Sequence, residues 1–131
     1  MTYKEIESYV EKADKYFNTA NHLLEYGDYD SCVSRAYYSM FYMTKAVLLT
    51  KNLITKTHSG TLSLFSESFI KTNTFPKEIA KYLRKGFQVR LLGDYNVMET
   101  MNKKDAADLM NNVEIFNERL KDYLVQNEYF E

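Results

Sequence analysis

Apolar side chains recur every three or four residues along most of this chain, which is the spacing of one face of an α-helix. The first such segment runs from Ile6 to Leu24. Gly27 follows it, and because glycine readily ends a helix we expect the helix to stop there. Turn residues then lead into a second periodic segment, which runs from about Ser31 to Leu49.

The second segment is apolar on two sides. One face contains Val33, Ala36, Tyr37, Met40 and Phe41, and the opposite face contains Tyr38, Tyr42, Ala46 and Leu49. A helix that is apolar on both sides must be covered on both sides. The pattern therefore predicts the central helix of a bundle, or a helix that forms an interface.

Two more helices are predicted in the middle of the chain. The first is short, is marked by Leu62, Phe65 and Phe69, and ends near residues 71–74. Pro76 can open the second, because a proline in the first turn loses no hydrogen bond that the helix needs. We expect that helix to reach about Gly93.

The last predicted helix begins near Asn102, whose side chain can cap it, with Asp105 in the first turn where the helix dipole favours an acid. Its apolar face comprises Ala106, Leu109, Met110, Val113, Phe116, Leu120 and Leu124. The sequence shows no alternating strand pattern, repeat or linker. We therefore predict an all-α, up-and-down bundle of four to five helices in a single domain that spans residues 1–131.

Composition adds several exclusions. Of the 131 residues 45% are hydrophobic and 27% charged, which is globular composition, and no apolar run is long enough to span a bilayer. The start, MTYKEIESYVEK, mixes acids and bases where a signal peptide would be basic and then apolar, so we expect a cytoplasmic protein. The lone Cys32 excludes an internal disulfide. Because only His22 and His58 accompany it, we expect no metal site, and no motif indicates a cofactor.

Charge is unevenly distributed although the net charge is only −1. Residues 1–30 carry three bases and seven acids, a net charge of −4. Residues 31–93 carry ten bases and two acids, a net charge of +8, and residues 94–131 carry four bases and nine acids, a net charge of −5. A basic middle between acidic ends can attract a polyanion. It can also let neighbouring helices complement one another, which is the simpler interpretation.

Arg90 is the most informative polar residue. It falls on the inward face of the predicted fourth helix, in line with the apolar residues Ile79, Leu83 and Phe87. A guanidinium keeps its charge and so needs partners, and Asp94 is the nearest candidate. Either this pair braces the end of the bundle, or Arg90 faces a phosphate in a polar site to which Tyr95 adds a hydroxyl.

The remaining charged and titratable residues have simple interpretations. Lys77, Lys81, Arg84 and Lys85 form a solvated helix face, and would contact nucleic acid only if they flank Arg90. His58 lies between two predicted helices, where it can cap, donate to a carbonyl, or act as an acid or base. Cys32 is expected to be a packed thiol. The acids Glu114, Glu118 and Asp122 share one face and are expected to lie in solvent.

Four pieces of the sequence are distinctive: SRAYYSMF at 34–41, KTHSG at 56–60, FIKTNTFPKE at 69–78, and Arg90 with Asp94 and Tyr95. Through these pieces, nearly the whole chain resembles the small stand-alone HEPN-domain proteins of bacteria and archaea. The resemblance implies a helical bundle that dimerises and is often encoded beside a minimal nucleotidyltransferase as a toxin–antitoxin pair.

Active relatives in that family are metal-independent endoribonucleases. Their motif consists of an Arg, a polar residue, and a His that follows the Arg by four to six positions. The motif lies at a dimer cleft. Arg90 matches the Arg of this motif. Leu91 replaces the polar residue, and Tyr95, Asn96 and Val97 stand where the His is expected. His58 could substitute for it only if the fold brings KTHSG to Arg90.

The resemblance also implies roles for several side chains. Tyr95 matches a tyrosine that a partner nucleotidyltransferase can modify. Arg35, Tyr38 and Tyr42 share the second face of their helix and are expected to form a homodimer interface, unless the fifth helix covers them.

Three functions follow as expectations. The first is a toxin-like or regulatory partner of a nucleotidyltransferase, with an RNA- or nucleotide-binding pocket around Arg90, Asp94 and Tyr95. Arg84, Lys85 and Lys81 would flank that pocket. The second is a metal-independent endoribonuclease with a degenerate motif, and the third is a non-enzymatic dimeric scaffold.

Overall fold

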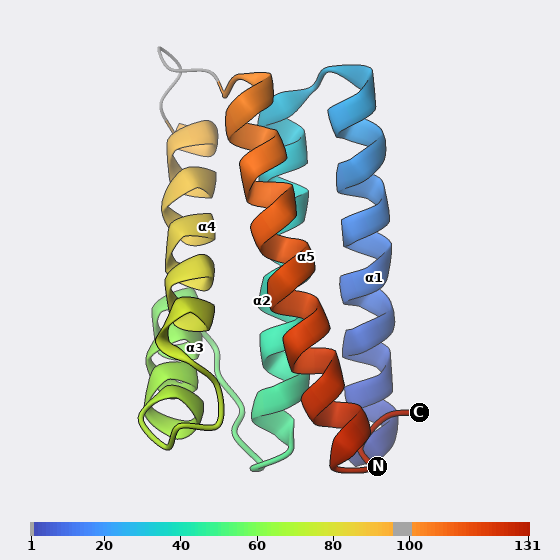
Figure 1. The fold of residues 1–131 in the computed structure, drawn as a ribbon, viewed down its shortest axis with the longest axis vertical. Helices are drawn as coiled ribbons and strands as arrows, with labels where there is room; N and C mark the ends of the chain where they lie inside the picture. The colour runs from blue at the N-terminus through green and yellow to red at the C-terminus, as the bar shows by residue number, and fades with distance from the viewer. Residues whose placement is uncertain (1, 96–100) are drawn as a thin grey trace.

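Four long helices lie side by side, each antiparallel to the next long helix along the chain, and a shorter helix packs at one end of them (Figure 1). The computed structural model describes residues 2–95 and 101–131. Its elements are α1 (Thr2–Tyr26), α2 (Tyr29–Leu49), α3 (His58–Phe65) with the π-helical turn η1 (Ser66–Ile70), α4 (Lys77–Tyr95) and α5 (Lys103–Gln126). The predicted all-α, up-and-down bundle is confirmed, and none of the described helices is long and apolar enough to cross a membrane.

The helix ends follow local chemistry. Gly27 ends α1 with a φ of +98°, a conformation that glycine adopts without strain. The side chain of Asp28 accepts a hydrogen bond from the backbone N–H of Ser31, so α2 begins two residues earlier than the periodicity predicts. Asn102 caps α5 as predicted, and together with Asp105 it forms a reciprocal capping box.

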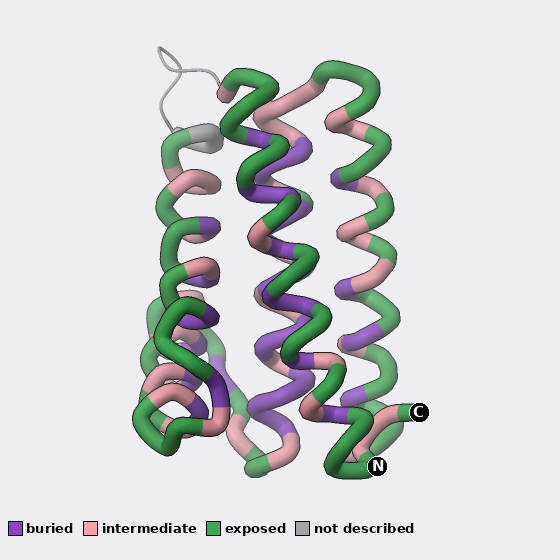
Figure 2. The backbone as a smooth tube through the Cα atoms, viewed as in Figure 1, coloured by how far each residue is buried: buried purple, intermediate pink, exposed green. Residues whose placement is uncertain are grey.

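Helix α2 is the central element of the bundle. It packs against α1, α4 and α5, and 12 of its 21 residues are buried (Figure 2). The prediction of a central helix from its two apolar sides is therefore confirmed. The buried residues include Val33, Ala36, Tyr37, Met40, Met43, Ala46, Val47 and Leu48.

Aromatic rings hold α3 in place. Phe65 stacks on Phe69 and on Phe75, with centroid distances of 5.9 and 5.8 Å, and contacts Phe116 of α5 at 5.9 Å. Such pairs add to the free energy gained by burying the rings. This phenylalanine cluster anchors the C-terminal end of α3, and the helix itself packs against α2 and α4. Together these contacts fix His58 at the first position of that helix.

Candidate functional site: Arg90, His58 and the tyrosines of α2

Arg90 lies on the side of α4 that faces α2. It is half-buried, and its Cζ atom lies 5.1 Å from the ring centroid of Tyr38 and 5.9 Å from that of Tyr37. Gly86, one turn earlier, permits this close packing, because a Cβ atom there would meet the end of the Met40 side chain and the ring of Tyr37. The sequence prediction that Arg90 falls on the inward face agrees with this position.

His58 contacts the same two tyrosines from the start of α3. It begins α3, where Thr57 caps the helix by accepting from the backbone N–H of Gly60. Its Nδ1 atom lies 2.8 Å from the hydroxyl oxygen of Tyr37, a residue with no exposed surface. The imidazole also packs 4.4 Å from the ring centroid of Phe41 and stacks at 5.7 Å on Phe87 of α4.

The electrostatics of this cluster favour a neutral imidazole. Burial lowers the pKa of His58, and the positive charges of Arg90 and Lys45 lower it further. Burial raises the pKa of the Tyr37 phenol, so the phenol stays protonated at neutral pH. The fold thus places a neutral imidazole, which can accept a proton, near the permanent charge of a guanidinium. This combination can bind a phosphate and transfer a proton beside it.

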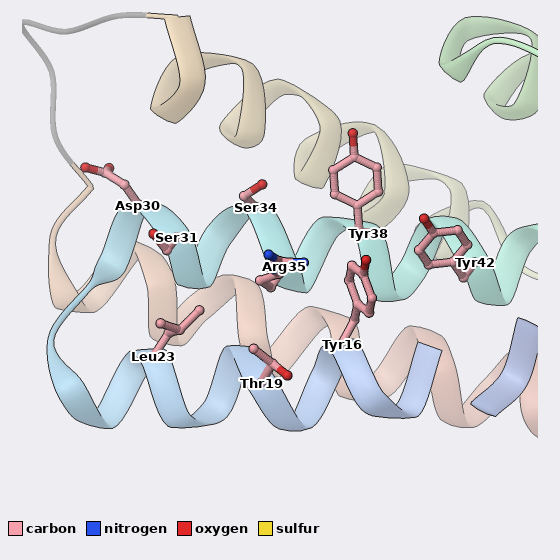
Figure 3. A pocket seen from close by; sticks show the side chains of 9 residues that line it. All are labelled: Tyr16, Thr19, Leu23, Asp30, Ser31, Ser34, Arg35, Tyr38 and Tyr42. Carbon is pink, nitrogen blue, oxygen red and sulfur yellow. The ribbon is translucent and has the colours of Figure 1, made fainter. Parts of the chain in front are cut away.

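A groove of about 700 Å³ extends from this cluster along α1 and α2 (Figure 3). It is lined by Tyr16, Thr19, Leu23, Asp30, Ser31, Ser34, Arg35, Tyr38 and Tyr42. Tyr38 belongs to both regions, because it lines the groove and also carries the Arg90 guanidinium on its ring. The site around Arg90 and the groove therefore form one continuous surface.

The fold brings together some of the residues that the sequence singles out and separates others. His58 and Arg90 meet at Tyr37 and Tyr38, and Arg35 joins Tyr38 and Tyr42 in the groove. The rings that cover Tyr38 and Tyr42 include Tyr9 and Tyr16 of α1, rather than rings of the fifth helix.

Other predicted site residues lie elsewhere. Lys81, Arg84 and Lys85 are exposed on α4, as are Glu114, Glu118 and Asp122 on α5. The backbone of α4 continues through Asp94 and Tyr95, whose side chains lie outside the described residues, as do Asn96 and Val97.

Several residues of the site are not evident from the sequence. Tyr37, Phe41 and Phe87 are expected core residues by their spacing, yet they enclose His58. Thr19 and Ser34 are ordinary polar residues on their helices until α1 and α2 are placed side by side. The available signal was the doubled tyrosine in SRAYYSMF, which turns one ring toward His58 and the next toward the groove.

Potential metal ligands do not gather in the described part of the chain. Residues 2–95 and 101–131 contain no group of three or more His, Cys, Asp or Glu that could hold a metal ion. Cys32 is buried, and burial raises the pKa of its thiol to about 11, with the charge of Asp28 adding to the effect. The thiol is therefore protonated and packed, as the sequence suggests.

The fold and the site define a small helical-bundle protein with a cationic, tyrosine-rich surface. A family model described as the HEPN domain matches residues 6–123. This match covers most of the chain, so the chain belongs to the HEPN family, and the resemblance inferred from its motifs is confirmed.

Relatives in archaea and bacteria share the whole domain. A Methanocaldococcus jannaschii protein named "Putative toxin MJ0142" is 39% identical over 122 residues, which cover 93% of this chain and 83% of the relative. A Thermotoga maritima protein named "UPF0332 protein" is 34% identical over 113 residues, which cover 86% of each chain. The crystal structure of TT1696 from Thermus thermophilus matches with a TM-score of 0.76 at 14% identity, over 89% of this chain and 96% of that one. At that identity the structural likeness shows the fold alone.

Proposed function

We propose that this HEPN protein is the toxin-like or regulatory partner of a minimal nucleotidyltransferase, and that it engages RNA or a nucleotide at Arg90. The observation that carries the proposal is the position of Arg90, whose guanidinium lies on Tyr38 within the cluster that holds His58. An arginine on an aromatic ring is well placed to pair with a phosphate. The names of two relatives as toxins support the same assignment.

The proposal includes a homodimer. It also includes a cytoplasmic location, because RNA and a nucleotidyltransferase partner would both be met in the cytoplasm. Co-expression with a minimal nucleotidyltransferase tests the partnership. We expect the two proteins to purify together, and mass spectrometry to find a nucleotide on the peptide that contains Tyr95. A Tyr95→Phe variant should remain unmodified. A protein that purifies alone and unmodified in the presence of such enzymes contradicts the partnership.

A second candidate function, metal-independent endoribonuclease, is favoured by the contact of His58 with Tyr37 beneath Arg90. In this reaction His58 takes the proton of a 2′-hydroxyl, whose oxygen then attacks the adjacent phosphorus. The bond from phosphorus to the 5′-oxygen breaks, and that oxygen takes up a proton. The products are a 2′,3′-cyclic phosphate and a 5′-hydroxyl, and Arg90 would stabilise the negative charge on the phosphorane.

RNA cleavage in EDTA separates the two candidates. We would compare the wild-type protein with Arg90→Ala, and with Arg119→Ala as a matched loss of an exposed arginine on α5. Cleavage that leaves cyclic phosphate ends and disappears only in Arg90→Ala assigns a ribonuclease. Absence of cleavage by the folded wild-type protein contradicts the ribonuclease, and leaves the binding and partner-controlled role as the function to test.

A further inference from the structure

The groove between α1 and α2 has the chemistry of a site for phosphate groups. Its walls carry the hydroxyls of Tyr16, Thr19, Ser34 and Tyr38, and Arg35 extends among them from the second turn of α2 (Figure 3). Arg35 is exposed. Hydroxyls and guanidinium groups are among the donors that proteins use against phosphate oxygens.

Cations are fixed around the tyrosines of this groove. The Cζ atom of Arg35 lies 5.1 Å from the ring centroid of Tyr16, and the Nζ atom of Lys12 lies 4.7 Å from that of Tyr42. Arg90 occupies the corresponding position on Tyr38, at 5.1 Å. The three rings contact one another, with centroids 5.3 to 6.4 Å apart. Cation–π contacts thus hold three positive charges around one tyrosine cluster.

The residues that line the groove include one cation, Arg35, and one acid, Asp30. Burial raises the pKa of the Tyr42 phenol, although the Lys12 ammonium opposes this effect, so the phenol adds no negative charge. Asp30 lines one end of the groove, and its Oδ1 atom accepts a hydrogen bond from the backbone N–H of Met101 at 2.9 Å. The acid therefore already has a structural role in tying the start of α5 to α2.

We propose that this groove binds the sugar–phosphate backbone of single-stranded RNA, in continuation of a strand whose neighbouring phosphate lies at Arg90. The inference rests on the proposed function and specifies its substrate as a strand rather than a free nucleotide. Tyr38 is the shared boundary, because it contacts Arg90 on one side and lines the groove on the other. The groove has a volume of about 700 Å³, which is within the range of pockets that hold a small ligand and can take a short stretch of one strand. Cations beside aromatic rings are the features by which proteins bind single strands.

Equilibrium binding tests this inference independently of cleavage. The probe is a fluorescein-labelled 2′-O-methyl oligouridine of about twelve nucleotides, within the length that single-strand sites cover. Its methylated 2′-oxygens prevent cleavage, so fluorescence anisotropy reports binding alone. Arg35→Ala is compared with Arg35→Lys, Arg90→Ala and the matched control Arg119→Ala, each over a series of salt concentrations. Sedimentation velocity gives the oligomeric state of every variant.

We expect Arg35→Ala to weaken binding by about tenfold, as the loss of a charged hydrogen bond does, and Arg35→Lys to weaken it less. The slope of log K against log salt should fall by about 0.7, the value for one phosphate contact on a single strand. Arg119→Ala should match the wild type in both measurements.

Three results overturn the inference, and they are distinguishable. If the wild type binds and Arg90→Ala weakens binding but Arg35→Ala does not, the groove is not an RNA site and the proposed function stands. If the wild type does not bind the probe, RNA engagement at Arg90 fails as well. If Arg35→Ala converts a dimer into monomers, the groove is the homodimer interface that the sequence predicts for Arg35, Tyr38 and Tyr42, and it is not an RNA site.

Discussion

The hydroxyl of Tyr37 and the Nδ1 atom of His58 lie 2.8 Å apart, although the two residues are 21 positions apart in the sequence. This hydrogen bond joins the buried centre of α2 to the first residue of α3. Phe41 and Phe87 pack on the same imidazole, so the ring is held by contacts from α2 and α4. The position of His58 near Arg90 therefore depends on a few contacts that can be removed one at a time.

Replacing Tyr37 by Phe removes the hydroxyl and keeps the ring. We expect Tyr37→Phe to lower the free energy of unfolding by about 1 kcal/mol, the usual net value of one hydrogen bond. Urea denaturation measures this loss, and Tyr26→Phe serves as a control because Tyr26 is 86% exposed at the end of α1. If the two variants have the same denaturation midpoint, the hydrogen bond does not hold His58 in place.

Acidification is expected to destabilise the protein through His58. Because the pKa of His58 is lowered in the folded state, the unfolded chain binds a proton more readily below pH of about 6.5. The free energy of unfolding should therefore fall as the pH drops from 7 through the folded pKa, and the contribution of His58 should level off below it. Denaturation series at several pH values would measure the slope.

His58→Gln removes this titration. The variant should lose less stability on acidification than the wild type, so the difference between the two should change between pH 7 and pH 5. An equal loss of stability in both proteins would assign the pH dependence to other groups.

Ser39 is at the centre of a buried polar contact that joins three helices. Its hydroxyl donates to the carbonyl of Ala13 in α1 at 2.6 Å and accepts from the side-chain amide of Asn117 in α5 at 2.9 Å. Ser39→Ala leaves both groups buried without this partner, and should cost about 1–3 kcal/mol. Urea denaturation measures this loss of stability, with Ser8→Ala as the control because Ser8 is an exposed serine of α1. If Ser39→Ala loses no more stability than Ser8→Ala, the result contradicts the role of this contact.

Helices and their ends could be predicted from the sequence because they depend on neighbouring residues. The cap at Asn102 and the stop at Gly27 are examples, since each involves residues within one turn. The periodicity predicts a start of α2 that is two residues too late, because the spacing of apolar residues contains no information on the cap formed by Asp28. The Ser39 contact could not be predicted, because it depends on how α1 and α5 are placed against α2.

The candidate site shows the same division between local and long-range information. Arg90 was located by its helix position, and His58 by its residue type. Their proximity could not be predicted, because it depends on how α3 and α4 pack against α2. The groove could not be predicted from the apolar face of α2, because the hydroxyls of α1 that complete it come from a separate helix.

The electrostatic coupling between Arg90 and His58 gives the most direct test of the site. Because the Arg90 charge lowers the pKa of His58, Arg90→Ala should raise that pKa toward its usual value. NMR titration of the imidazole protons measures the change, with the signal assigned from its absence in His58→Gln.

Arg84→Ala is the matched control, because it removes the same charge from an exposed position on the same helix and should leave the pKa of His58 unchanged. Arg90→Lys keeps a positive charge and should give an intermediate value. If Arg90→Ala instead costs several kcal/mol of stability and leaves the pKa of His58 unchanged, Arg90 is a structural brace of the bundle and the site does not include it.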